Sequence, residues 1–185
     1  MSAANYSPDD LGRTLREALD FVAPSGPDQP PTVFALVPTP VLAQLDPELV
    51  DPDDDSPLSL LAEDPLPAAG PGDDAEPYAA LEEFLATASW PEPVVGAAVV
   101  LDIVVLPPDA RADLSEQHQP PLVRSAARNH PDSRSARLAV GALRGGPRLA
   151  LLELVPESTD EPHELRTHPE LAADLQDALS AALAE

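Results

Sequence analysis

One apolar run constrains the fold of this chain more than any other feature. Residues 94–106 read VVGAAVVLDIVVL, and a proline stands immediately before and after the run. Aliphatic and β-branched residues on both alternating faces are typical of a strand that is buried on both sides. The run is too short to span a bilayer. It therefore predicts the central strand of a sheet, with Gly96 and Asp102 on the less apolar face.

Helical and extended patterns surround this strand. The sequence Ser7-Pro8-Asp9-Asp10 is typical of a helix start, because serine caps, proline suits the first turn and acids favour the positive end of the helix dipole. Apolar periodicity then predicts further elements in a fixed order. They are a strand at 32–37, a short helix within 41–50, helices at 77–88 and 121–129, strands at 136–143 and 149–155, and a helix after 167.

The two strands at 136–155 are expected to form a hairpin across Gly145-Gly146-Pro147. A three-residue loop sends Arg137 and Glu153 to one face, and it sets Arg144 opposite Arg148. The other face then gathers the apolar residues Leu138, Val140, Ala142, Ala150, Leu152 and Leu154. Further along, Thr167-His168-Pro169-Glu170 has the spacing of a capping box and predicts that the last helix begins there.

These patterns predict an α+β protein. We expect an antiparallel sheet of about four strands, with the amphipathic N- and C-terminal helices packed on one face. Residues 1–185 are expected to form a single domain, interrupted at about 51–77 by a flexible, acidic, proline-rich excursion. The leucines in that segment belong either to an inert insertion or to a part that docks on the domain or on a partner.

Charge excludes several classes of partner. The chain has 33 Asp and Glu against 10 Arg, no lysine, and a net charge of -23. Phosphate backbones and anionic membrane surfaces repel such a chain, so neither nucleic acid nor a membrane is an expected partner. Seven of the arginines lie within residues 111–150, which carry a net charge of +4. They either pair internally or form a site for a small anion or an acidic partner.

The residues for several chemistries are missing. There is no cysteine, and no nucleophile elbow, phosphate-binding loop or HExxH motif is present. Asp51, Asp53 and Asp55 have the spacing of a calcium loop, but Ser56 and Ala62 stand where the motif needs glycine and a bidentate acid. His163 and His168 fit no standard metal-ligand spacing. We expect no cofactor and no metal, and, because no secretory signal begins the chain, a cytoplasmic location.

Two small sets of residues are candidates for a site. Trp90, Arg137, Arg144 and Arg148 are candidate interaction residues, and Trp90 is either a core-capping residue or an interface anchor. Asp102, His130, Asp132 and Arg137 are the groups that a small-molecule enzyme would draw on. Asp102 is either a buried carboxylate with a raised pKa or an outward residue on a half-exposed face.

Several local patterns, in their order along the chain, resemble a family of small uncharacterised actinobacterial proteins. The patterns are Asp28-Gln29-Pro30-Pro31 before Phe34-Ala35-Leu36-Val37, Trp90-Pro91, Gly96-Ala97-Ala98 before Pro107-Pro108, His130-Pro131-Asp132, and Leu143-Arg144-Gly145-Gly146. The resemblance covers most of the chain outside 51–77 and carries no catalytic residue with it. It implies a cytoplasmic protein of high-GC bacteria, whose coding bias explains the lack of lysine. Halophilic adaptation is the alternative source of the acidity.

Two functional hypotheses follow. The first is a non-enzymatic interaction protein, such as an adaptor, small chaperone or regulator, whose acidic surface favours a basic protein partner. The second is an enzyme with a small-molecule site built from Asp102, His130, Asp132 and Arg137. A pocket containing two of these side chains favours the enzyme, and their dispersal counts against it. Homodimerisation through an exposed strand edge is compatible with either hypothesis.

Overall fold

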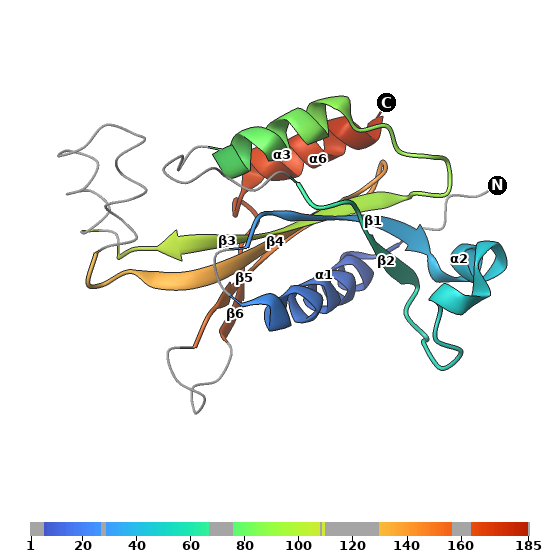
Figure 1. Cartoon of the computed structure of the whole chain (residues 1–185), viewed down its shortest axis with the longest axis horizontal. Coiled ribbons are helices and arrows are strands. Elements are labelled where there is room, and N and C mark those ends of the chain that lie inside the picture. The colour runs from blue at the N-terminus through green and yellow to red at the C-terminus, as the bar shows by residue number, and fades with distance from the viewer. Residues whose placement is uncertain are drawn as a thin grey trace.

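The structure is a computed structural model of the chain. It describes residues 6–26, 29–66, 76–107, 109, 130–156 and 164–184, with only the backbone of 76–78. Six strands form one antiparallel sheet in the order β2-β1-β3-β4-β5-β6. Helices α3 and α6 lie over one face of the sheet, and helix α1 lies over the other (Figure 1). The predicted helix at 121–129 falls outside the described residues.

The elements follow the chain in a simple order. The strands are β1 (Thr32–Pro38), β2 (Leu58–Ala62), β3 (Gly96–Val105), β4 (Arg134–Leu143), β5 (Arg148–Leu154) and β6 (Glu164–Thr167). The helices are α1 (Pro8–Val22), α2 (Thr39–Leu45), α3 (Glu76–Thr87) and α6 (Ala173–Ala184), with 3-10 turns η1 (Ala23–Ser25) and η2 (Pro47–Leu49). The apolar run at 94–106 is confirmed as a central strand, since β3 pairs with both β1 and β4.

Alternate side chains of β3 feed two separate layers of the core. Ala97, Val99 and Leu101 pack with residues of α3 and α6. Ala98 and Val100 pack with residues of α1 on the opposite face. All five side chains are buried. The period of two along the strand therefore supplies two apolar surfaces, and each needs its own helical cover.

Helix α1, which covers the second of these faces, is held close to the sheet. Ser7 and Asp10 form the reciprocal capping box that starts α1, so the predicted helix start is confirmed. At Gly141 of β4, an added Cβ would lie only 2.9 Å from Leu15 Cδ2. Leu11 and Leu15 are fully buried above that glycine. A side chain at 141 would push α1 away, so glycine there sets how closely the helix packs.

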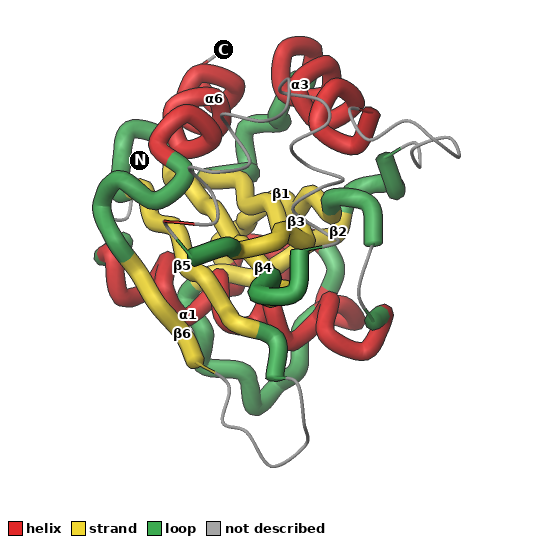
Figure 2. The backbone as a smooth tube through the Cα atoms, turned by 90° about the vertical axis from the view of Figure 1, so that its left-hand side faces the viewer, coloured by secondary structure: helices red, strands yellow, loops and turns green. Residues whose placement is uncertain are grey.

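The terminal helices lie on opposite faces, and the prediction that they share one face is wrong. Figure 2 shows α1 below the sheet and α6 above it, beside α3. Helical periodicity identifies which stripe of a helix is apolar, but it does not say which face of the sheet the stripe meets. The sheet decides which face each helix covers, because β3 and β4 are apolar on both sides. If both terminal helices packed on one face, the apolar side chains of the other face would be exposed to water.

The sheet has six strands rather than about four. The two additional strands, β2 and β6, are its edges, and they are only five and four residues long. β2 lies inside the segment that we predicted to be a flexible excursion. Residues 58–62 differ from that prediction, because they pair with β1 and Leu58 is fully buried. An edge strand is held by backbone hydrogen bonds to its single neighbouring strand, so its sequence need not alternate between apolar and polar residues. Both strands therefore lack the sequence pattern of the central ones.

Two local predictions near the C-terminus also change. The hairpin of β4 and β5 has the predicted faces, with Arg137 opposite Glu153, but it is shifted by two residues. Ala142, rather than Arg144, lies opposite Arg148, so the like-charged pair is avoided. The predicted capping box at 167–170 is wrong, because Thr167 is the last residue of β6. Its hydroxyl donates to the Ala150 carbonyl, and α6 begins at Ala173.

Candidate functional site

A cavity of about 610 Å³ lies between α3, α6 and the sheet. Its floor is the sheet side chains Leu101, Ile103 and Leu138, and its walls come from the two helices. The wall residues are Leu81, Glu82, Leu85 and Ala86 on the α3 side, with Ala172, Asp174, Leu175, Ala178, Ala181 and Ala182 on the α6 side. A volume of this size is within the usual range of about 300–1,000 Å³ for small-ligand sites.

Small side chains create the cavity. Where α6 faces it, alanine stands at 172, 178, 181 and 182, and α3 adds Ala86. A methyl group cannot bridge the gap between two helices that rest on a sheet, so the volume between them stays unfilled. Ala178 and Ala182 lie one turn apart on α6 and both line the cavity. The signal for a cavity was the small size of these residues, rather than their hydrophobicity.

The polar groups of the cavity are acidic. Glu82 of α3 and Asp174 of α6 are its charged lining residues, and both are exposed. Among the residues that the structure describes, no basic side chain lines the cavity. An apolar volume with carboxylates at its rim favours an apolar group that carries or adjoins a positive charge.

Asp102 and Arg137 form a buried ion pair on the opposite face of the sheet. They lie opposite each other on β3 and β4, and Arg137 Nε donates to Asp102 Oδ1 over 3.2 Å. The Arg137 side chain is 7% exposed and the Asp102 side chain is 16% exposed. Arg137 Nη2 also donates to the Gly26 carbonyl, and Asp102 Oδ2 accepts the Gln29 N–H, both at 3.0 Å. The pair therefore fixes the chain that leaves α1 to the centre of the sheet.

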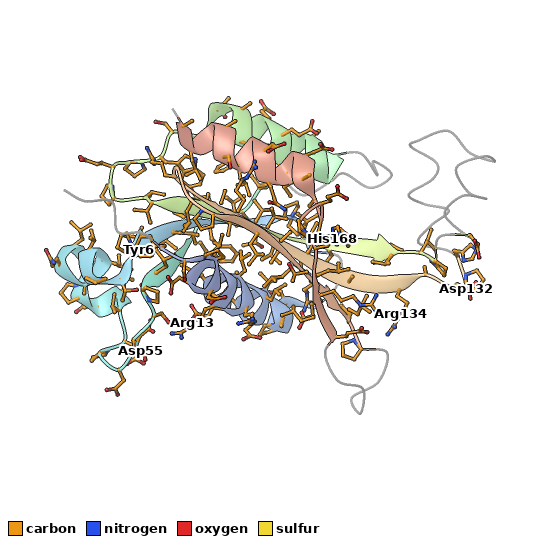
Figure 3. All side chains as sticks on the ribbon, turned by 180° about the vertical axis from the view of Figure 1, so that it is seen from behind. Tyr6, Arg13, Asp55, Asp132, Arg134 and His168 are labelled. Carbon is orange, nitrogen blue, oxygen red and sulfur yellow. The ribbon has the colours of Figure 1, made fainter. Side chains whose placement is uncertain are left out.

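The other two residues of the enzyme hypothesis lie elsewhere. His130 Nδ1 is 3.9 Å from Asp132 Oδ2 and accepts the Asp132 N–H at 3.1 Å, within the turn before β4. Figure 3 places Asp132 at the far end of the β3–β4 ribbon, away from α3 and α6. None of Asp102, His130, Asp132 and Arg137 lines the cavity. The four residues therefore form two separate pairs rather than one site.

The candidate interaction residues have structural contacts. The Trp90 ring packs edge-on to Phe84 of α3 with centroids 6.1 Å apart, and its Nε1 is buried without a hydrogen-bond partner among the described residues. Arg144 Nη2 reaches the Trp90 carbonyl at 3.5 Å. Arg148 forms an ion pair with Asp177 of α6. The structure thus brings Trp90 and Arg144 together, and places Arg137 and Arg148 in two separate ion pairs.

The acidic loop before β2 uses its carboxylates internally. Asp51 Oδ1 accepts the Asp53 N–H at 3.0 Å, and Asp54 Oδ1 accepts the Ser56 N–H at 2.9 Å. Within the described residues, no cluster of three or more His, Asp or Glu side chains has the arrangement to hold a metal ion. Over the same residues, no helix combines the length and apolar character needed to cross a membrane.

Fold and cavity together define a class: a three-layer α+β protein with a central antiparallel sheet and an apolar, acid-rimmed cavity under two helices. The chain belongs to the PPA1309-like protein family, whose family model matches residues 11–184. This match agrees with the resemblance to a family that covers most of the chain. No curated protein and no solved structure gives a significant match to it.

Proposed function

We propose that this protein is a non-enzymatic interaction protein that holds an apolar anchor of a basic partner in the cavity between α3 and α6. The carrying observation is the cavity itself, an apolar volume with Glu82 and Asp174 at its rim. Buried apolar anchors supply most of the binding energy of an interface, and complementary charge at the rim guides and orients the partner.

The charge of the chain supports a basic partner. A net charge of -23 repels acidic proteins at long range and attracts basic ones, with a strength that falls as salt rises. The composition, which lacks lysine and is rich in alanine and proline, supports the further proposal that the protein acts in the cytoplasm of an actinobacterium.

The enzyme hypothesis has no comparable support. Acid–base or nucleophilic chemistry needs groups that converge on one reacting atom. Asp102 and Arg137 hydrogen-bond to each other and to the backbone near the end of α1, on the face of the sheet away from the cavity. His130 and Asp132 lie in the turn that precedes β4.

The test is affinity capture from native lysate at low and moderate salt, read by mass spectrometry, with the wild type and two single tryptophan variants. Ala178→Trp fills the cavity from the exposed side of α6. Ala184→Trp makes the same change on the same helix outside the cavity lining. We expect one partner to be captured by the wild type and by Ala184→Trp and to be lost with Ala178→Trp.

Charge reversal provides a second matched pair. Glu82→Arg changes the cavity rim, whereas Glu83→Arg makes the same change at an exposed α3 position outside the lining. Capture should fall at least about tenfold for Glu82→Arg and much less for Glu83→Arg, because only Glu82 borders the cavity that the partner's anchor would enter. Equal capture by all four variants would overturn the proposal, and so would a wild type that is recovered alone as a monomer.

A further inference from the structure

The two edges of the sheet differ in how they discourage contact with another chain. β6 is four residues long, all its residues are exposed, and its Arg166 pairs with Glu164 at 2.7 Å. Short, charged strands of this kind are a usual protection against edge-to-edge pairing. β2 is longer, reads LSLLA, and contains neither a charge nor a proline. Within the described parts of the chain, β6 therefore has this protection and β2 lacks it.

Hydrogen bonds at the two ends of β2 show which of its backbone groups point outward. The Glu63 N–H donates to the Val33 carbonyl at 2.9 Å, and the Pro57 carbonyl accepts the Thr39 N–H at 3.1 Å. Backbone groups alternate sides along a strand, so residues 57, 59, 61 and 63 face β1. The groups of Leu58, Leu60 and Ala62 then face away from it. Leu58 is fully buried, so the outward groups that a further strand can reach are those of Leu60 and Ala62. Within the described residues, the strand ladder of β2 involves β1 alone.

The surroundings of β2 indicate the kind of chain that would fit. Exposed aspartates at 53, 54 and 55 precede the strand, and Glu63 and Asp64 follow it. Arg13 offsets part of this charge through an ion pair with Asp55 at 3.7 Å, and the two lie close together in Figure 3. A second copy paired antiparallel on β2 would bring the acids before one strand against the acids after the other. Like charges across such a pair are destabilising.

We propose that the open edge of β2 is a strand-addition site for an extended segment of a basic partner protein. The segment would become a seventh strand, with its backbone bonded to Leu60 and Ala62. Lysine or arginine residues on either side of it would meet the acids at 53–55 and 63–64. Backbone bonds supply the affinity in this mode of recognition, and the flanking charges supply the selection.

The site is separate from the cavity, so it is tested separately. The probe is a synthetic peptide of five alternating valine and threonine residues with two lysines at each end. Its control has glutamates in place of the lysines. Backbone amide exchange of the full chain is followed by NMR. The lysine peptide should slow exchange at Leu60 and Ala62 by at least about tenfold, because these amides gain hydrogen bonds in the complex. The glutamate peptide should not.

A proline variant tests the edge directly. Ala62→Pro removes an outward N–H, and proline is tolerated where an edge strand faces solvent. Ala62→Val keeps the N–H and serves as the matched control. Affinity for the lysine peptide should fall at least about fivefold in Ala62→Pro, as expected for one lost hydrogen bond. It should be unchanged in Ala62→Val and in the cavity variant Ala178→Trp.

Three results would overturn the strand-addition site. One is equal binding of the lysine and glutamate peptides. Another is binding that survives Ala62→Pro but is lost in Ala178→Trp, since the peptide would then sit in the cavity. The last is slowed exchange at Leu60 and Ala62 that grows with protein concentration in the absence of peptide, because the occupant would then be a second copy of the chain.

Discussion

The two faces of the sheet are covered in different ways. On one face, the single helix α1 buries Leu11, Leu15, Ala18 and Leu19, and Gly141 of the sheet lets it approach closely. On the other face, the two helices α3 and α6 cover a similar stretch of β3 and β4 and leave a cavity between them. One helix with large side chains thus closes its face, whereas two helices with small side chains do not.

This difference separates stability from binding. Leucines that interdigitate over a glycine fill the space under α1, and a filled face has no room for a ligand. Alanines on α6 leave apolar sheet side chains next to an open volume, which is a cost in stability unless something fills it. The α1 face is therefore the structural side of the molecule. The α3–α6 face, which has the unfilled volume, is the side on which we propose that a partner binds.

The largest difference in the free energy of unfolding should appear when one leucine on each face of the sheet is replaced by alanine. Leu15→Ala removes a fully buried side chain under α1 and should lower the free energy of unfolding by about 4 kcal/mol. Leu175→Ala removes a partly buried side chain that already borders the cavity, and should cost about 1 kcal/mol. Chemical denaturation of both variants measures the difference. Equal losses would mean that the two faces are packed alike.

A somewhat smaller effect on stability is expected at the Asp102–Arg137 ion pair, which holds the chain that follows α1. Arg137→Ala removes the charged partner of Asp102 and the donor to the Gly26 carbonyl, and should cost about 3 kcal/mol. Replacing both residues, as Arg137→Met with Asp102→Leu, removes the buried charges together and should restore stability to within about 1 kcal/mol of the wild type. Urea denaturation distinguishes the two. A double variant as unstable as the single one would show that the backbone contact, rather than the charge, is decisive.

The smallest expected effect is a pH dependence on α1. Burial raises the pKa of Glu17, and the hydrogen bond that Ser56 donates to its carboxylate only partly opposes this. A raised pKa in the folded state means that the neutral form contributes its full stability below the unfolded-state pKa. That contribution is lost as pH rises through the folded-state pKa. At neutral pH the charged Glu17 therefore lowers the stability of the fold.

Glu17→Gln should therefore stabilise the protein at pH 7 by less than about 1 kcal/mol, since solvent screens a partly exposed carboxyl. The gain should vanish below the usual glutamate pKa of about 4.3. Thermal unfolding at both pH values measures it, with Glu83→Gln on the exposed side of α3 as a control for the loss of one negative charge. An equal gain in the control, or a gain that is larger in acid, would contradict the assignment.

Much of the fold could be predicted from local patterns. The Ser7 cap, the central strand at 94–106 and the two faces of the β4–β5 hairpin follow from periods and turn residues, which act over a few neighbouring residues. The edge strands could not be predicted, since β6 has no buried residue and β2 lies in an acidic, proline-rich context. The site was predicted least well. Its residues are ordinary alanines and leucines, and only their arrangement across three elements makes a cavity.

By itself, the sequence determined the acidity and the lack of cysteine and lysine side chains. It also determined that the strand at 94–106 is apolar on both faces, and where most of the helices lie. These are properties of composition or of short-range periodicity. Only the tertiary structure decided that the terminal helices lie on opposite faces, that Asp102 meets Arg137, and that α3 and α6 leave a volume between them. Each of these depends on residues far apart in the chain, and long-range packing selects among arrangements that local patterns leave equally possible.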